Sequence, residues 1–446
     1  MTAHDDDDTK PDTPDTPNKP DTPEDPSLRW WEHGNEDLRG RRKARQLELI
    51  IEAFRRDQGI EVVPYPSGRL EDAIFLYRAD TVLSRDRDAG EIAQTLGQSL
   101  AAKSEAGTSP PVAGLYVHRL PKGRDAMEVI QELDEQFGAG TATPDHVLHI
   151  TTSSCCPATE PLPSAGTPQP GINPDPASDG SGTRVAVVDT GLRSDVVAEH
   201  PWLAGVTGEE EPPDIGHYTG HGTFVAGVLR TMAPAAEVSV DALLIVGGAV
   251  LESELSHDLG AALERMPDII SISAGTRTRG GRPLLSLQVF WEERLRHVKG
   301  TVVVAAAGND GDRGPFYPAA FPWTVSVGAL DTDGQRAGYS NHGSWVDVYA
   351  RGSDVVNAYP TGWYTYEEPP LQGSKTNFLT GLANWSGTSF STPLVSGLIA
   401  ARMTWSGESA RQAADSLLEL ALEHARPGVG KVLEPGRADP PVPGSS

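Results

Sequence analysis

Residues 185–191 read Val-Ala-Val-Val-Asp-Thr-Gly, an apolar run that ends in a carboxylate and a glycine turn. Two further glycine-bearing segments follow: residues 220–223 read Gly-His-Gly-Thr, and residues 387–393 read Gly-Thr-Ser-Phe-Ser-Thr-Pro. In chain order these segments supply an Asp, a His and a Ser. Residues 305–310, Ala-Ala-Ala-Gly-Asn-Asp, add a side-chain amide after another apolar run.

These four groups are the parts of a serine hydrolase. Ser389 is the candidate nucleophile and His221 the general base, while Asp189 is the carboxylate that orients the imidazole and Asn309 is a donor to the oxyanion. The order Asp, His, Ser differs from arrangements in which the His or the Ser comes first. Alone, Asp189 would be a turn former and Asn309 a turn residue, but the combination favours a catalytic site.

The four segments, with a fifth at residues 338–348 (Gly-Tyr-Ser-Asn-His-Gly-Ser-Trp-Val-Asp-Val), resemble the subtilisin family of serine proteases, the subtilases. The similarity runs from about Arg184 to Ala401, roughly half of the chain. The resemblance implies a serine endopeptidase that hydrolyses peptide bonds through an acyl-enzyme on Ser389. A lipase-type nucleophile elbow, Gly-x-Ser-x-Gly, would need a glycine where this chain has Ser391.

The resemblance also implies where a substrate would bind. Ser273-Ala274-Gly275 matches the edge at which a peptide adds as an extended strand. Gly275 and Gly308 would flank the pocket for P1, the residue before the scissile bond. Phe316 stands where the family usually has a small or polar residue, so its ring would shrink this pocket. The alternative is that the loop differs and Phe316 packs elsewhere.

The chain departs from the family's pattern in two places. Arg351 stands where the family generally shows a proline, so the local turn is expected to differ. Residues 361–384 are longer than usual before the nucleophile and are aromatic and acidic in character. We expect this segment to form a rim or a lid of the site.

Runs rich in Val, Ile and Ala alternate with amphipathic segments from residue 184 onward. This pattern predicts an α/β fold with a doubly wound, mostly parallel sheet, because such runs suit parallel strands buried on both faces. The expected strands are 184–188, 238–244, 269–273, 301–306 and 324–327. The expected helices are 222–231, 252–264, 285–297 and 389–404.

The chain before residue 184 has a different pattern and predicts a small α+β domain. A basic stretch, 39–45, opens an expected helix with Leu47, Ile50, Ile51 and Phe54 on one face. Expected strands follow at 72–78, 114–119 and 146–150, and expected helices at 91–103 and 125–137. The position of this module resembles that of the propeptide of many subtilases. The alternative is an unrelated N-terminal module.

The expected domain boundaries follow from these patterns. Residues 1–38 are an acidic, Pro/Thr-rich tail that is expected to be disordered, because it cannot bury enough apolar area to offset ordering entropy. The N-terminal module then covers 39–150, a linker 151–182, the subtilisin-like catalytic domain 183–425, and a second disordered tail 426–446.

The charge and composition of the chain limit the classes of partner that it is expected to bind. The formal net charge of −25 argues against nucleic acid and anionic membranes as partners. There is no run of 18 apolar residues and no pattern of a secretory signal at the N-terminus, so a cytoplasmic location is expected. The only two cysteines, Cys155 and Cys156, are adjacent and do not make a disulfide framework. No calcium-ligand spacing is recognisable, so neither a metal nor a cofactor is expected.

Two functions from different classes remain. The first is an active endopeptidase on peptide or protein substrates that is restrained by its N-terminal module. It would be a zymogen if it cuts itself within 151–165. The second is a peptide-binding or scaffold protein on a protease fold, without turnover. The presence of every catalytic residue favours the first.

Overall fold

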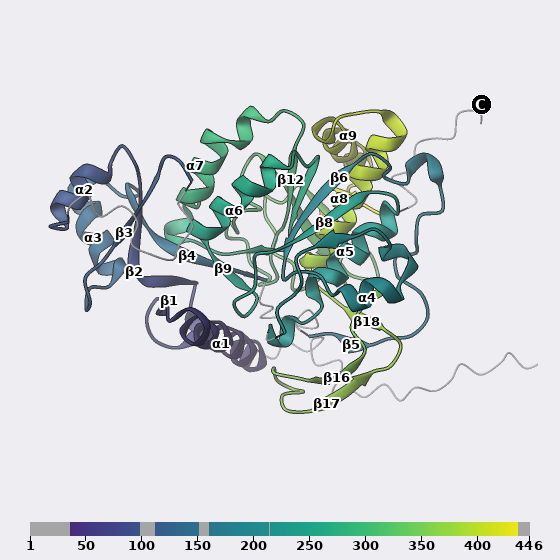
Figure 1. Ribbon diagram of the computed structural model, residues 1–446, viewed down its shortest axis with the longest axis horizontal. Helices are drawn as coiled ribbons and strands as arrows, with labels where there is room; N and C mark the ends of the chain where they lie inside the picture. Colours follow the sequence, from purple (N-terminus) through teal and green to yellow (C-terminus); the bar gives the residue numbers. More distant parts are fainter. Residues whose placement is uncertain (1–35, 99–111, 151–159, 214, 436–446) are drawn as a thin grey trace, which may run out of the picture. The chain divides into compact units, whose positions relative to one another are not determined.

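The computed structural model describes residues 36–98, 112–150, 160–213 and 215–435. Its largest sheet has eight strands in the order β19-β14-β13-β12-β10-β6-β8-β7, and all seven strand pairs in it are parallel (Figure 1). The strands are β6 Arg184–Asp189, β7 Thr207–Gly208, β8 Glu237–Ala242, β10 Ile269–Ile272, β12 Val302–Ala306, β13 Thr324–Leu330, β14 Val348–Arg351 and β19 Val432–Leu433. The expected doubly wound α/β fold is confirmed.

Helices cover both faces of this sheet, because successive residues of its strands point to opposite sides. Val185 and Val187 of β6 pack in one buried cluster with α5, α8 and α9, whereas Ala186 and Val188 pack in another with α6 and α7. The helices are α4 Ser194–Glu199, α5 His221–Met232, α6 Glu252–Glu264, α7 Leu285–Glu293, α8 Thr388–Ser406 and α9 Ala410–Glu423.

The N-terminal module consists of helices on a small antiparallel sheet. Its β2 pairs with β1, β3 and β4, all antiparallel. On α3 the residues Ala126, Val129, Ile130 and Leu133 are buried. The elements are α1 Glu36–Ala53, a π-helical turn Phe54–Gln58, β1 Val62–Tyr65, β2 Phe75–Arg85, α2 Ala89–Thr95, β3 Leu115–Arg119, α3 Ala126–Phe137 and β4 Ala142–Ile150.

The sheet of the module continues into the catalytic domain. Strand β4 pairs antiparallel with β9 (Ala249–Leu251) on one side and with β11 (Ala274–Gly275) on the other. The module and the catalytic domain therefore share one sheet. The expectation that residues 70–150 pack against the catalytic domain is confirmed for the described residues.

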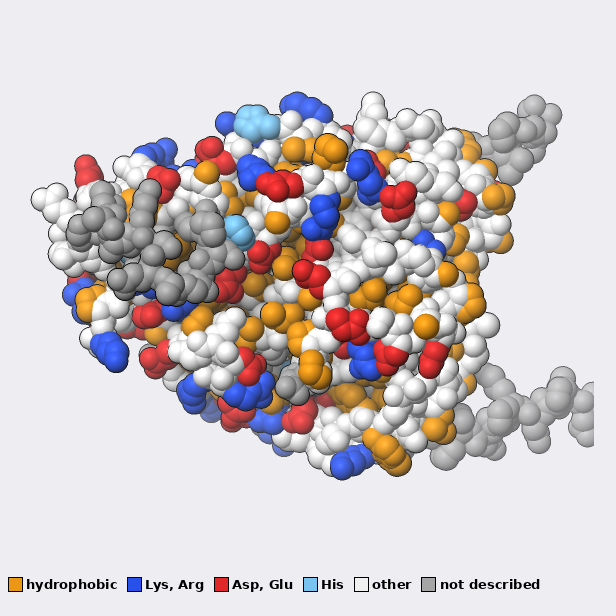
Figure 2. Space-filling view, viewed as in Figure 1, with side chains coloured by type: hydrophobic (Ala, Val, Ile, Leu, Met, Phe, Trp, Pro, Cys, Tyr) orange, Lys and Arg blue, Asp and Glu red, His pale blue; other side chains and the backbone are white. Residues whose placement is uncertain are grey.

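Two small sheets lie beside the helical layer that contains α5. In one, β18 (Leu382–Trp385) pairs with β15 (Val355–Ala358) and β5 (Leu162–Pro163). The other is a hairpin of β16 (Gly362–Thr365) and β17 (Lys375–Phe378), within the segment that is longer than the family's pattern. Trp363 and Leu379 of this hairpin region are 75% and 78% exposed, and hydrophobic side chains are visible at its position in Figure 2.

The structure corrects several expected boundaries. Within the expected tail 426–446, residues Val432 and Leu433 form β19 and pair with β14, because the chain after α9 returns to the sheet edge. Within the expected linker 151–182, the described part adds β5 to a sheet. The expected helix 91–103 ends at Thr95 as α2, and residues 99–111 lie outside the described part, as do residues 1–35 of the expected acidic tail. Among the described residues, no helix is long and apolar enough to cross a membrane.

Candidate active site

Asp189 and His221 form a buried hydrogen-bonded pair. Asp189 ends β6, at the carboxyl edge of the parallel sheet where such folds bind ligands, and His221 begins α5. The His221 Nδ1 and Asp189 Oδ1 atoms are 2.7 Å apart, and the two residues are 1% and 0% exposed. The backbone N–H of Thr190 donates to the same oxygen at 2.8 Å. With one side of its ring held by this carboxylate, the imidazole presents Nε2 in the opposite direction.

Aromatic rings surround the His221 imidazole. The Trp385 ring lies edge-on at 5.2 Å between centroids, and the Phe390 ring lies at 5.5 Å. The Tyr218 ring makes a further edge contact at 6.1 Å. These rings restrict the imidazole to one orientation and shield its hydrogen bond to Asp189 from water.

Ser389 is the second residue of α8, whose N-terminus lies beside that of α5. The ring of the next residue, Phe390, packs on Phe224 of α5 at 4.7 Å and on the His221 ring. The Ser389 hydroxyl is 3.4 Å from the carbonyl oxygen of Ser273, whose own hydroxyl donates to the Ser389 carbonyl at 3.1 Å. At a helix N-terminus, backbone N–H groups and the helix dipole favour negative charge.

The amide of Asn309 is held in a fixed orientation. Its Oδ1 accepts from both the backbone N–H and the hydroxyl of Thr388, each at 2.9 Å. Nδ2 therefore points away from Thr388, and a methyl group added to Gly387 would lie 3.5 Å from it. The amide donor thus faces the turn that carries Ser389.

Asn341 fixes the loop that carries Asn309. Its Oδ1 accepts from the backbone N–H groups of Asp310 and Asp312, both at 3.0 Å, and its Nδ2 donates to the Ala307 carbonyl at 2.8 Å. The sequence placed Asn341 within a family-like segment but did not predict this supporting contact, which joins chain segments about thirty residues apart.

The ring of Phe316 lies against Gly275 and Gly308. A methyl group built on Gly275 would be 2.3 Å from Phe316 Cε1, and one built on Gly308 would be 3.2 Å from the ring. Phe316 itself is 2% exposed. The ring therefore lies at the two glycines, and the role of these glycines beside the P1 pocket stays a prediction.

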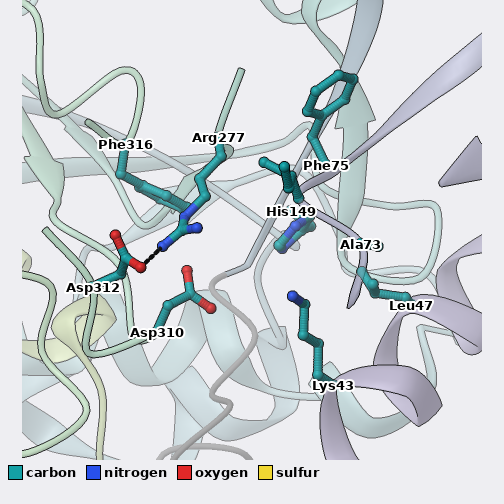
Figure 3. A pocket seen from close by; sticks show the side chains of 10 residues that line it. Lys43, Leu47, Ala73, Phe75, His149, Arg277, Asp310, Asp312 and Phe316 are labelled. Carbon is teal, nitrogen blue, oxygen red and sulfur yellow. Dashed lines mark ion pairs between the residues drawn. The ribbon is translucent and has the colours of Figure 1, made fainter. Parts of the chain in front are cut away.

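A polar cavity of about 170 Å³ adjoins Phe316, between the module and the catalytic domain. Lys43 and His149 enter it from the module, while Arg277, Asp310 and Asp312 enter it from the catalytic domain (Figure 3). Arg277 and Asp312 form an ion pair at 2.5 Å. Burial lowers the pKa of both Lys43 and His149. The cavity is thus lined by charged groups of both signs.

Strand β4 lies along the expected substrate-binding edge. Ile150 is the partner of Ala274 and His149 is the partner of Gly275 in the antiparallel register. On its other side, Leu148 is the partner of Val250. The Tyr218 hydroxyl donates to the Ile150 carbonyl at 3.3 Å. Residues 151–159, which follow β4 and include both cysteines, lie outside the described part of the chain.

Helix α1 is anchored on the turn of the β16–β17 hairpin. Arg42 Nε donates to the Pro369 carbonyl at 2.5 Å, and Arg45 Nη2 pairs with the Glu367 carboxylate at 3.0 Å. The buried side chain of Gln46 donates to the carboxylate of Glu368, which is 0% exposed. Three side chains of the module therefore hold this turn.

Glu160, just after the undescribed segment, is anchored to the same turn. Its Oε1 accepts from the Tyr364 hydroxyl at 3.0 Å and from the Glu367 N–H at 2.7 Å, and its Oε2 accepts from the Glu368 N–H at 3.2 Å. Burial, and next the charge of Glu368, raise the pKa of Glu160 to about 8.

The structure brings the sequence-predicted site residues into one region. Asp189, His221, Ser389 and Ser273 are linked by the contacts above, and Asn309 joins them through Thr388. Ala274, Gly275, Gly308 and Phe316 line the adjoining edge. Among the described residues, no group of three or more His, Cys, Asp or Glu side chains could hold a metal ion.

Comparison with known proteins gives the same family along this part of the chain. A model of the subtilase family, peptidase S8, matches residues 180–421, more than half of the chain. Thermitase of Thermoactinomyces vulgaris is 31% identical over 250 residues, which cover 52% of this chain and 78% of thermitase. Subtilisin E of Bacillus subtilis (strain 168) is 29% identical over 260 residues, which cover 53% of this chain and 60% of subtilisin E.

One solved structure resembles a larger part of the chain. The crystal structure of fervidolysin from Fervidobacterium pennivorans, a keratinolytic enzyme related to subtilisin, aligns with a TM-score of 0.54 and 19% identity. The alignment covers 81% of this chain and 61% of fervidolysin. At this identity the likeness concerns the fold, and it extends beyond the residues that the family model matches.

Proposed function

This chain belongs to the subtilase family, and on that premise we propose that it is an endopeptidase with Ser389 as nucleophile, His221 as general base and Asp189 as orienting carboxylate. The observation that carries the proposal is the buried Asp189–His221 hydrogen bond of 2.7 Å beside the N-terminus of α8. A His of fixed tautomer next to a serine is the arrangement that acyl transfer requires.

In the proposed reaction, the Ser389 hydroxyl oxygen attacks the carbonyl carbon of the scissile peptide bond while His221 Nε2 takes its proton. The tetrahedral intermediate collapses as the C–N bond breaks, and His221 returns the proton to the leaving amine. Water then hydrolyses the acyl-enzyme with His221 again as base. Asp189 stabilises the imidazolium in both steps.

The developing oxyanion would be bound by the backbone N–H of Ser389 and by Asn309 Nδ2. This role is supported by the two hydrogen bonds from Thr388, which orient the amide before any substrate arrives. Donors that need no reorganisation are the efficient ones, and removing one typically costs about 10²–10³ in kcat.

Labelling with a fluorophosphonate and hydrolysis of a peptide test this assignment. Ser389→Ala and His221→Ala should each abolish both, whereas Asn309→Ala should slow peptide hydrolysis about 10²–10³-fold. Ser391→Ala is the matched control, since it removes a buried hydroxyl two residues away on the same helix. Hydrolysis that persists in purified Ser389→Ala would rule the assignment out. Peptide binding without labelling or hydrolysis in the wild type would favour the scaffold function.

We further propose that the N-terminal module inhibits the enzyme. The supporting observation is that β4 pairs with Ala274 and Gly275, the backbone edge that an extended substrate would need. A peptide cannot add to that edge while β4 occupies it, because each strand edge accepts one partner. The contacts of Arg42, Arg45 and Gln46 with the hairpin turn would keep the module in place.

A finer proposal concerns the substrate. If Gly275 and Gly308 flank the P1 pocket, the Phe316 ring that lies against both leaves room only for a small P1 side chain. We therefore propose that the enzyme cleaves after residues such as Ala, Ser or Gly.

A further inference from the structure

Glu211 is a buried carboxylate outside the sequence motifs. It is 5% exposed and lies between β7 and α5, outside the helices and strands. The Thr190 hydroxyl donates to its Oε1 at 2.9 Å. The backbone N–H of Gly220 donates to both of its oxygens, at 2.8 and 3.0 Å. A carboxylate is costly to bury, and these donors offset that cost.

The partners of Glu211 are the direct neighbours of two candidate catalytic residues. Thr190 follows Asp189, and Gly220 precedes His221 at the N-terminus of α5. Together with the Asp189–His221 hydrogen bond, these contacts close a ring that passes through both residues and through Glu211. The Thr190 hydroxyl also accepts from the Gly222 N–H at 3.1 Å, which adds a second tie between the two segments.

We propose that Glu211 is a positioning residue for the peptidase reaction, holding the Asp189 turn and the N-terminus of α5 in register so that His221 aims at Ser389. The inference rests on the proposed function. The segments are in close contact, since a methyl group on Gly191 would lie 2.9 Å from the Glu211 backbone. Misplacement of a catalytic group by about 1 Å can cost 10²-fold in rate. Loss of the Glu211 contacts, which hold the segments next to Asp189 and His221, should therefore slow the reaction.

Because Glu211 can ionise, its contacts with Thr190 and Gly220 should depend on pH. Burial raises its pKa to about 7; the nearby Asp189 acts in the same direction, and the bonds from Thr190 and Gly220 and the charge of Arg193 oppose it. The described residue Tyr359 also interacts electrostatically with Glu211. A protonated Glu211 has one acceptor oxygen fewer, so the alignment of His221 should improve as the pH rises through this value.

The test compares Glu211→Ala and Glu211→Gln with the wild type, all as full-length chains. Glu210→Gln is the matched control, because the adjacent Glu210 is exposed and its hydrogen bonds with Ser194 are long, 3.3–3.4 Å. The first readout is the rate of fluorophosphonate labelling of Ser389 between pH 5 and 9. The second is the downfield proton NMR resonance of the His221 Nδ1–H, which is observed without turnover.

Glu211→Ala should slow labelling by about 10²-fold and shift or broaden the His221 resonance. Glu211→Gln keeps one acceptor oxygen, so it should slow labelling less and give a shallower acid limb of the pH profile. Should Glu211→Ala not fold, Glu211→Gln carries the test. Wild-type rates, pH profile and resonance in both variants would overturn the proposal. A failure to label both in the wild type and in Arg45→Glu, a variant in which the N-terminal module is held less tightly, would refute the proposed function instead, and the resonance would still report on Glu211.

Discussion

At the scale of single residues, the Phe316 ring shows how one side chain fills space beside the candidate site. It lies against two glycines that cannot carry a side chain without moving it. The residue type was visible in the sequence, but its placement depended on the fold of the loop around Tyr317 and Pro318. The polar cavity next to the ring, with its Arg277–Asp312 pair, was not predictable at all, because its walls come from five separate parts of the chain.

Substitution of this ring gives a prediction on specificity. Phe316→Gly should open the pocket and raise kcat/KM for peptides with Phe or Leu at P1 by at least tenfold, while substrates with Ala at P1 change little. One methylene in such a pocket is worth about 1–3 kcal/mol, and a ring is worth more. A P1 library profile of both proteins measures this. A wild-type profile dominated by bulky P1 residues would contradict the prediction.

The catalytic candidates could be predicted from the sequence because each sits in a short local motif. Asp189 at a strand end, His221 in a glycine turn and Ser389 at a helix start are recognisable without knowledge of the fold. Asn341 and Glu211 were not, because their contacts cross between loops that are distant in sequence. A buried Glu in a loop has no local signal that distinguishes it from the exposed Glu209 and Glu210 beside it.

At the scale of elements, the contact between α1 and the β16–β17 hairpin is the feature with the most consequence. The hairpin turn holds α1, which precedes β4, and Glu160, which follows the undescribed segment. The hairpin turn therefore binds the chain both before and after residues 151–159. A cut within that segment would leave both flanks attached to the enzyme.

A charge exchange tests the α1 contact. Arg45→Glu and Glu367→Arg should each weaken the contact between α1 and the hairpin turn and increase the rate of fluorophosphonate labelling. The double variant restores an ion pair of reversed sign, so its stability and labelling rate should return most of the way to those of the wild type. The coupling should be small, about 0.5–1 kcal/mol, because both side chains are partly exposed. Chemical denaturation and labelling of all four proteins measure it. Arg55→Glu, an exposed charge reversal further along the chain, should have no effect.

Glu160 gives this contact a pH dependence. Its folded-state pKa of about 8 lies above the ordinary value of 4.5, so between these values the folded state holds a proton that the unfolded state has lost. Stability should therefore fall as the pH rises from about 4.5 to 8, by at most about 1.4 kcal/mol per pH unit. Denaturation midpoints at several pH values measure the slope. The dependence of stability on pH should be smaller in Glu160→Gln and unchanged in the exposed Glu199→Gln. An equal dependence in all three proteins would contradict the raised pKa of Glu160.

The expected strands and helices of the catalytic domain are present, and the omissions have identifiable reasons. Strand β14 reads Val-Tyr-Ala-Arg, which lacks the Ile-rich run that indicated β10, a strand of the same length. Helix α9 carries a Ser409–Gln412 capping box and a buried face of Ala413, Leu417 and Ala421, so its signals were present in the sequence and were overlooked. The shared strand pairing of β4 is a tertiary contact with no local signal.

For the whole molecule, the sheet that β4 shares with β9 and β11 makes the module and the catalytic domain interdependent. Side chains of both signs are interspersed on the face seen in Figure 2. Release of the module would leave the backbone groups of β9 and β11 without their strand partners. An extended substrate would satisfy the same groups.

Measurement of the intact mass distinguishes a propeptide that is cut off from a regulatory domain that stays attached. If the module is a propeptide, the purified wild type should be cut within 151–165, while Ser389→Ala should remain at full length. The wild-type module should then co-purify with the catalytic domain, because the hairpin and the shared sheet hold it after cleavage. An uncut wild type that nonetheless labels with a fluorophosphonate would indicate a permanent regulatory domain.

The short strand β19 has a practical consequence for where the chain can be shortened. A chain ended at residue 425, after α9, would lack Val432 and Leu433, and the Tyr349 N–H on the exposed edge of β14 would lose the Lys431 carbonyl to which it donates at 2.9 Å. Bare strand edges recruit further chains. Such a shortened protein should self-associate, as light scattering would reveal, whereas one ended at residue 435 should stay monodisperse to the same extent as the full chain.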